Sequence, residues 1–124
     1  MIEQLGQVML YVEDQQQAME FWTTKLGFTV LSDTTNGLRV ITLVPKDEGQ
    51  TAIVLHDKKK IAEMSPELVL ATPSLMFIAR DVQGLYDRLV VEQVTVGELV
   101  DTPYGKVFNF ADFEGNYFAV TERL

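Results

Sequence analysis

The chain contains a single histidine, His56, and histidine is the side chain whose ordinary pKa lies nearest neutrality. It follows an apolar stretch, residues 51–55, that favours a β-strand. Alternate residues of a strand share a face, so His56 points to the same side as Val54. If that side is enclosed, His56 could hydrogen-bond a ligand or act as a general base. If the strand ends at the surface, His56 beside Asp57 is an ordinary solvent-exposed residue.

Other groups with reactive side chains give weaker signals. Ser74 has no acid or base partner at motif spacing and lies outside any Gly-x-Ser-x-Gly sequence. This context is more typical of a small residue that lines a cavity than of a nucleophile. The carboxylates fall mostly in expected turns and helix starts, with no pair at alternating strand positions, so a two-carboxylate mechanism has little support. The absence of cysteine excludes disulfides, thiolate metal sites and cysteine nucleophiles.

Length and composition bound the class of protein. The 124 residues suffice for one domain, and 47% hydrophobic residues can fill a core. Ten Lys and Arg against eighteen Asp and Glu give a net charge of −8, which disfavours nucleic acid as a partner. The first thirty residues show neither a secretion signal nor an apolar segment of membrane length, so we expect a cytoplasmic protein with no membrane partner.

The first half of the chain predicts the element order β-α-β-β-β. Asp14 is a natural N-cap, the apolar residues Ala18, Phe21, Trp22 and Leu26 recur at helical spacing, and Gly27 suits the helix end. The predicted helix spans residues 14–26. The predicted strands are 5–12, 28–32, 38–44 and 51–55, with turns at 33–37 and 45–50.

The second half repeats this pattern after a connector. Residues 58–72 have no clean period and contain Pro66, although a short helical turn around Ile61 is possible. Asp81 then repeats the N-cap of Asp14 at an offset of 81 − 14 = 67 residues. The predicted elements are strands at 74–79, 94–99, 107–111 and 117–121, and a helix at 81–91.

The duplication indicates an α+β fold of two β-α-β-β-β modules in one domain. Module one covers about residues 4–57, the connector 58–72 and module two 73–122. A four-stranded sheet with one helix covers only one of its faces. Two such sheets can therefore curve around a shared space.

The opening and the ending of the chain carry a family resemblance. Residues 8–14 (VMLYVED), followed by Phe21-Trp22 and by residues 26–28 (LGF), resemble the opening of the vicinal oxygen chelate superfamily. Residues 112–116 (DFEGN) look like the family's DPDGN turn, with Phe113 in place of the usual Pro. That superfamily contains glyoxalase I, extradiol dioxygenases, and fosfomycin- and bleomycin-resistance proteins. The resemblance implies two β-α-β-β-β modules forming an open, curved barrel around a cavity.

The resemblance also implies where a metal ion would bind. The enzymes of the superfamily place His or Glu ligands on the first and last strands of each module, and these positions match Gln7, Val54, Ser74 and Ala119. Two of the four side chains cannot donate to a metal, and an amide with a neutral hydroxyl is a weak ligand set. We therefore expect no metal and no other cofactor.

Strand alternation predicts which residues line the cavity. If alternate residues of the first strand pack on the helix, the others face the cavity, and the first strand of module two behaves alike. The predicted lining is apolar with a few polar tips. It comprises Gln7, Met9, Tyr11, Thr42, His56, Ser74, Met76, Tyr104, Asn109 and Phe110.

These features support three functions from different classes. The leading hypothesis is a metal-free binding protein that sequesters a drug or metabolite without changing it, as the bleomycin-resistance branch does. The alternative is a metal-dependent lyase, transferase or dioxygenase of the superfamily, which must overcome the missing ligands. A scaffold or regulatory protein without a small-molecule site is the third. By resemblance, and because sheet edges need covering, we expect a homodimer.

Overall fold

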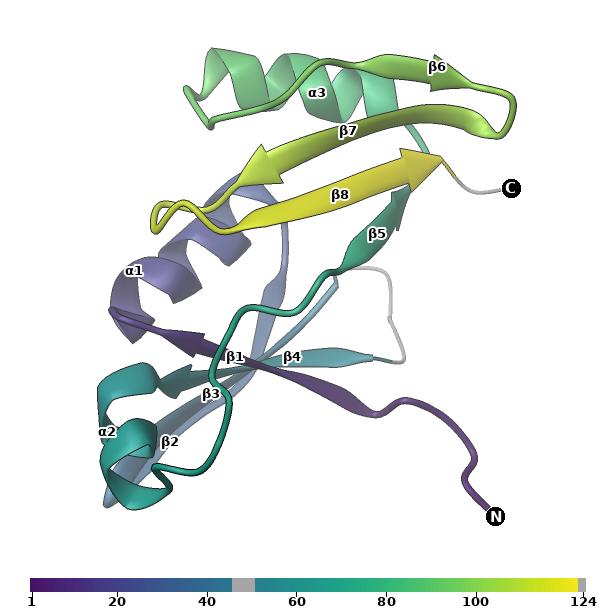
Figure 1. Ribbon diagram of the computed structural model, residues 1–124. Coiled ribbons are helices and arrows are strands. Elements are labelled where there is room, and N and C mark those ends of the chain that lie inside the picture. The colour runs from purple at the N-terminus through teal and green to yellow at the C-terminus, as the bar shows by residue number, and fades with distance from the viewer. Residues whose placement is uncertain (46–50, 123–124) are drawn as a thin grey trace. The chain divides into compact units, whose positions relative to one another are not determined.

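The computed structural model describes residues 1–45 and 51–122, which divide between Thr72 and Pro73 into two compact units. Both contain helix and sheet, as the predicted α+β class requires (Figure 1). Most of the predicted turn at 45–50 lies outside the described residues. No helix within the described residues is long and apolar enough to cross a membrane.

The first unit is a four-stranded sheet with helices. Its strand order is β1-β4-β3-β2, in which β1 runs parallel to β4 and the other neighbours are antiparallel. The strands are β1 (Gln7–Val12), β2 (Thr29–Asn36), β3 (Leu38–Val44) and β4 (Ala52–Asp57), and the helical segments are α1 (Gln15–Glu20), the π-helical turn η1 (Phe21–Lys25) and α2 (Lys58–Met64).

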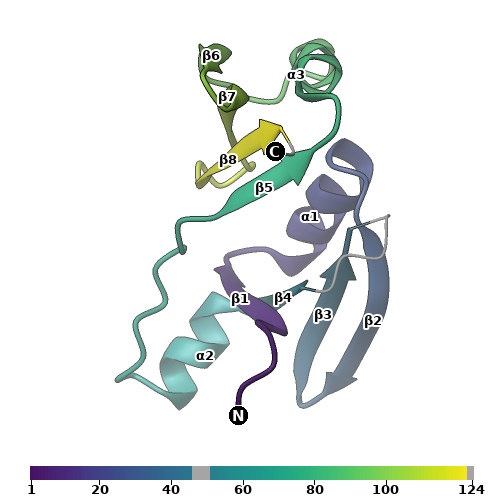
Figure 2. The ribbon, with the colours of Figure 1, turned by 90° about the vertical axis from the view of Figure 1, so that its right-hand side faces the viewer.

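Helix α1 begins where the sequence predicts it and lies along β3 and β4 (Figure 2). The Asp14 carboxylate accepts a hydrogen bond from the Gln17 N–H at 2.9 Å, which satisfies a free donor of the first turn. The helix continues as η1, which carries Trp22 into the core, and the chain leaves it at Gly27 with a φ of +77°. Together α1 and η1 confirm the predicted helix, because helical backbone runs from Gln15 to Lys25.

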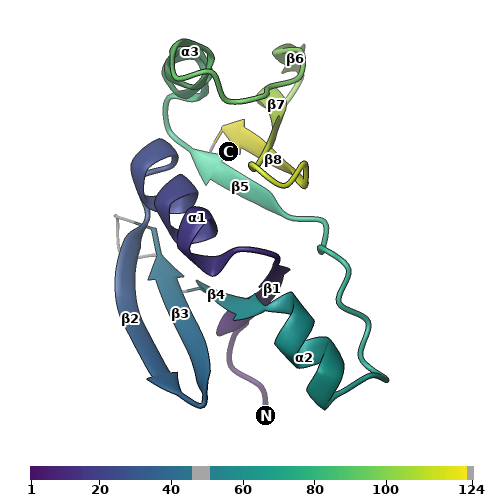
Figure 3. The same cartoon turned by 90° about the vertical axis from the view of Figure 1, so that its left-hand side faces the viewer.

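The second unit repeats this plan. Its strand order is β5-β8-β7-β6, with β5 parallel to β8. The elements are β5 (Met76–Ala79), α3 (Val82–Val91), β6 (Val100–Thr102), β7 (Gly105–Ala111) and β8 (Tyr117–Glu122). Helix α3, capped by Asp81, packs on β7 and β8 (Figure 3). Its side of the sheet is filled by Phe108, Phe118 and other aromatic rings.

A predicted strand and a predicted turn differ from the structure. The predicted strand at 94–99 is wrong: only a single bridge joins Val96 to Phe110, and β6 forms later, at Val100–Thr102. The segment therefore pairs with β7 at two separate places, the Val96 bridge and β6. Its backbone turns as it leaves α3, because Gln93 has a left-handed φ of +63°. The predicted turn at 33–37 shortens to Gly37, since β2 and β3 extend to either side of it.

The connector contains a helix rather than a single turn. The Asp57 carboxylate accepts a hydrogen bond from the Lys60 N–H at 3.1 Å and thereby caps α2. The sequence signal was weak because no apolar stripe runs along these residues, and none of the helix is buried.

The cap of α3 yields a prediction about coupled substitutions. A Cβ at Gly84 would collide with the capping carboxylate of Asp81, whose Oδ1 accepts from the Gly84 N–H at 2.9 Å. Asp81→Ala should lower the free energy of unfolding by about 1 kcal/mol. Gly84→Ala should be neutral or destabilising alone, yet should stabilise the Asp81→Ala variant by about 1 kcal/mol, because alanine favours helix once the clash is gone.

Urea denaturation of the four proteins measures this coupling. Glu63→Ala, a change on the exposed surface of α2, serves as the control. Additive effects of the two substitutions would contradict the prediction.

Candidate functional site

The first sheet has one face packed on α1 and one face opposite it. Leu10, Ile53 and Leu55 alternate into the core on the α1 side. The other face, called here the first open face, is defined by the strand register. Met9 lies opposite Val54, Tyr11 lies opposite His56, and Thr42 of β3 lies opposite Val54. The first open face thus comprises Gln7, Met9, Tyr11, Thr42, Val54 and His56.

The helix side is tied to the ends of β3 and β4 by one amide. Gln15, the first residue of α1, donates through Nε2 to the carbonyl oxygen of Leu55 at 3.0 Å and to that of Arg39 at 2.7 Å. Leu55 directly precedes His56, so Gln15 holds the backbone that positions the histidine. The sequence reasoning missed Gln15, because nothing in the pattern separates it from its neighbours Gln16 and Gln17.

His56 lies on the first open face in contact with two side chains of β1. Its ring stacks on Tyr11 with 5.5 Å between ring centroids and 25° between ring planes. Its Nε2 lies 3.2 Å from the Sδ of Met9. The neighbouring Asp57 carboxylate instead caps α2. His56 is therefore half-buried among apolar and aromatic groups rather than paired with an acid.

This environment changes the proton affinity of the imidazole. Burial lowers the pKa of His56 below its usual value, because the low-dielectric surroundings disfavour the charged ring. The neutral form therefore predominates near pH 7. A neutral imidazole can accept or donate a hydrogen bond and can accept a proton only weakly.

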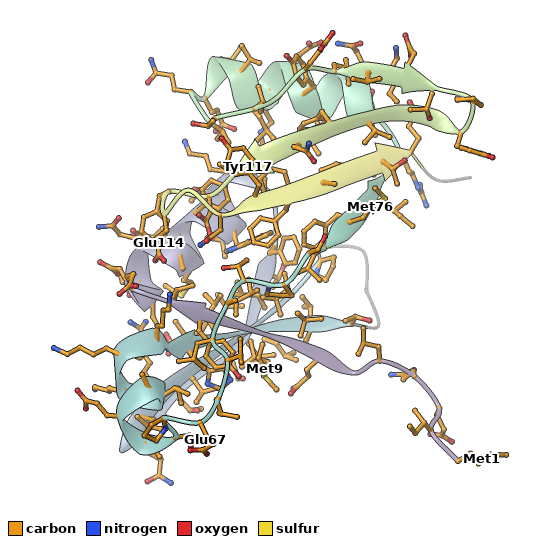
Figure 4. All side chains as sticks on the ribbon, viewed as in Figure 1. Met1, Met9, Glu67, Met76, Glu114 and Tyr117 are labelled. Atoms are coloured by element: carbon orange, nitrogen blue, oxygen red, sulfur yellow. The ribbon has the colours of Figure 1, made fainter. Side chains whose placement is uncertain are left out.

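The second unit has a comparable face, called here the second open face. Met76 of β5 lies opposite Ala119 of β8, and Ala119 lies opposite Asn109 of β7. Met76, labelled in Figure 4, extends from β5. It has 61% of its surface exposed, and Asn109 is also exposed. Ser74 is exposed and precedes β5, while Tyr104 is exposed in the turn between β6 and β7.

Phe110 does not belong to the second open face. It is fully buried, with its ring centroid 6.4 Å from that of Phe77 and 5.6 Å from that of Phe118. Adjacent strand residues point to opposite faces, so Asn109 and Phe110 cannot line the same surface. The sequence prediction that included both is corrected: Asn109 lies on the open face and Phe110 in the core.

The four positions that correspond to metal ligands do not fit a divalent ion. Val54 is 3% exposed beside Met9, and Ala119 lies beside Met76, so both positions present hydrocarbon. Gln7 and Ser74 supply only a neutral amide and a neutral hydroxyl. Among residues 1–45 and 51–122, no three His, Cys, Asp or Glu side chains gather closely enough to hold an ion.

Comparison with known families agrees with the duplicated fold. The chain is a protein of two repeated units, each built from a four-stranded mixed sheet and at least one helix. Residues 4–120 match the model of the Glyoxalase/Bleomycin resistance protein/Dioxygenase superfamily, and the chain belongs to that superfamily. The family resemblance seen in the sequence is thereby confirmed.

Individual relatives cover almost the whole chain. The uncharacterized protein YetH of Bacillus subtilis (strain 168) is 34% identical over 124 residues, which cover 98% of this chain and all of that protein. TnmS3 of Streptomyces sp. CB03234, described as an antibiotic binding protein, is 25% identical with a TM-score of 0.84, covering 99% of this chain and 98% of that one. A superfamily member from Sphaerobacter thermophilus DSM 20745 is 25% identical with a TM-score of 0.81, covering 98% of each chain.

The pKa of His56 yields a prediction for stability against pH. When a folded-state pKa is lowered, the unfolded chain takes up the proton first as the pH falls below about 6.5. His56 should therefore reduce the free energy of unfolding as the pH falls from about 6.5 toward the folded-state pKa, and should have no effect above that window. Urea denaturation at about pH 7.5 and about pH 5.5 should show a larger loss for the wild type than for His56→Gln. Equal losses in the two proteins would mean that the ring is not desolvated.

Proposed function

We propose that the protein binds a small, partly apolar organic molecule reversibly, without a metal ion and without changing the molecule chemically. The observation that carries this proposal is the composition of the first open face. A buried valine stands where the superfamily's enzymes place a carboxylate, and Met9, Tyr11 and His56 form a continuous uncharged surface beside it. Such a surface favours apolar ligands with a few directional hydrogen bonds.

The comparison with TnmS3 supports a binding role. That protein is described as an antibiotic binding protein and shares 25% of its residues with this chain over nearly the full length of both. A drug or a metabolite of similar character is the ligand that we propose here. Gln7 and Thr42 in the first unit, and Ser74 and Asn109 in the second, offer amide and hydroxyl groups for hydrogen bonds. Each is tested by its own alanine variant.

The alternative function is catalysis by a metal-dependent lyase, transferase or dioxygenase. The lactoylglutathione lyase of Agrobacterium tumefaciens shares the fold at 18% identity and a TM-score of 0.77, which speaks for the fold alone. Catalysis of that kind requires about three strong donors around one ion. Gln7 and Ser74 are neutral, and the other two matched positions are hydrocarbon, so the alternative ranks second.

Metal titration separates the two functions. We expect no stoichiometric site of micromolar or tighter affinity for Zn²⁺, Ni²⁺ or Mn²⁺, since roughly two anionic ligands are missing from the set. Isothermal titration calorimetry of the chelator-treated protein provides the measurement. Gln17→Ala, on the exposed side of α1, is the control for Gln7→Ala.

A tight site that Gln7→Ala abolishes would overturn the metal-free proposal. Native mass spectrometry of the purified protein then shows any co-purified organic molecule. A rise in melting temperature when that molecule is added back distinguishes a binding protein from a scaffold.

We further propose that the protein acts in the cytoplasm as a homodimer. The strands β1 and β2 lie at the edges of the first sheet, and β5 and β6 lie at the edges of the second. All of β2 is exposed, including Leu31 at 67%. Exposed edges with apolar side chains favour association with a second copy.

Sedimentation at micromolar concentration tests the assembly. A homodimer should sediment as a species of 2 × 14.0 = 28.0 kDa. Leu31→Lys should shift the distribution toward the monomer, because a charge on an edge strand opposes pairing. A single 14.0 kDa species for the wild type would contradict the prediction.

A further inference from the structure

Three side chains of the first open face form one continuous cluster. Tyr11 and His56 stack with 5.5 Å between centroids across the β1–β4 pair. Met9 contacts the imidazole through its sulfur, 3.2 Å from Nε2, and remains 38% exposed. This set is called here the Tyr11–His56 cluster. It presents a phenol ring, an imidazole ring and a polarizable thioether on one surface.

The contact with Met9 favours one tautomer of the imidazole. A thioether sulfur carries no hydrogen and can only accept, so the contact is a hydrogen bond when Nε2 holds the proton. Neutral His56 then has an unprotonated Nδ1 with a lone pair. Within the part of the chain that the structure describes, Nδ1 accepts no hydrogen bond. The cluster therefore presents one unused acceptor at the edge of a stacked pair of rings.

The charged groups of the neighbouring elements are engaged elsewhere. Asp57, next to His56, caps α2, and Arg39 of β3 is held by Asp33 at 2.7 Å. Lys58 of α2 lies 3.9 Å from Glu13 at the end of β1. Desolvation is the cause of the lowered pKa of His56, with no contribution from a neighbouring charge. The cluster is therefore an uncharged surface, suited to a neutral ligand rather than to an ion.

We propose that the Tyr11–His56 cluster is a stacking subsite for a planar aromatic ring that carries a hydroxyl or N–H donor directed at Nδ1 of His56. This inference rests on the proposed binding function and names the chemical class of its ligand. Tyr11 and His56 are both partly exposed, so a further ring can stack on them, and a thioether adds favourable contacts to an aromatic edge. A donor on that ring satisfies the one free acceptor, which a ligand without a donor leaves unused.

Three small probes of similar size separate the two parts of this proposal. The aromatic alcohol 2-naphthol has both the flat ring and the donor, 2-methoxynaphthalene has the ring alone, and 2-decalol has the hydroxyl on a saturated skeleton. Titrations followed by protein NMR at about pH 7.5 report the affinity of each probe and the shifts of the His56 ring nitrogens. We expect 2-naphthol to bind about fivefold more tightly than 2-methoxynaphthalene, the ratio typical of one neutral hydrogen bond. It should exceed 2-decalol by about threefold or more, the contribution of aromatic stacking.

Paired substitutions at one position test the two contributions separately. His56→Phe keeps a ring but has no acceptor, so the ratio between 2-naphthol and 2-methoxynaphthalene should fall to about one. His56→Gln keeps an acceptor without the ring, so the advantage of 2-naphthol over 2-decalol should shrink. Tyr11→Leu should weaken both naphthalenes alike. Phe113→Leu, in the exposed turn between β7 and β8, removes an aromatic ring outside the cluster and should change none of these ratios.

The changes in ratio separate recognition from folding, because a merely destabilised protein would weaken all three probes together. Binding of 2-naphthol that is no tighter than that of 2-decalol, or that is unaffected by His56→Phe and Tyr11→Leu, would overturn the aromatic subsite. Failure of all three probes to perturb the His56 ring nitrogens would overturn it as well. The proposed binding function would then still be judged separately, by the molecule that co-purifies with the protein and its effect on the melting temperature.

Discussion

The parallel pairing of β1 with β4 is the constraint on which the first unit depends. A strand alternates its side chains between two faces, and the register that places Leu10 beside Leu55 also places Tyr11 beside His56. The core under α1 requires the first of these pairs, since Leu10 and Leu55 are almost completely buried. A shift of one residue would expose that core to solvent. The stacked rings on the open face are therefore held in place by apolar packing on the other side of the sheet.

Three aspartates at or just after the ends of strands cap the helices that follow them. Asp14, Asp57 and Asp81 each accept a hydrogen bond from a backbone N–H in the first turn of a helix. For Asp57 this role has a consequence beyond helix stability. A carboxylate beside an imidazole would raise its pKa, but here the acid is used as a cap and the histidine experiences desolvation. The first open face remains neutral although the chain carries a net charge of −8.

The second unit repeats the arrangement of the first at the equivalent positions of its sheet. The pairs Met9 with Val54 and Met76 with Ala119 occupy equivalent places, where a methionine on the first strand faces a small or apolar residue on the last. In the superfamily's enzymes these last-strand positions supply metal ligands. With hydrocarbon there, neither unit offers a strong donor at this position.

The sequence by itself determined the features that depend on neighbours along the chain. These include the repeated strand, aspartate cap and helix, the alternation that put Met9 and Tyr11 on one face of their strand, and the apolar side chains of Val54 and Ala119. Each follows from the spacing of residues along the chain or from the type of a residue, and both are properties of the sequence itself.

Only the tertiary structure decided what depends on residues distant in sequence. Tyr11 and His56 are 56 − 11 = 45 residues apart, and their stacking requires the parallel register of two strands that no local pattern specifies. The same holds for Phe110. Its side chain lies in the core with that of its cross-strand partner Phe118, on the face of the sheet opposite to that of Asn109. The late start of β6 follows in the same way from how the chain approaches β7. Alternation establishes that neighbouring residues of a strand point to opposite faces of the sheet. Only packing against a helix decides which of the two faces is buried.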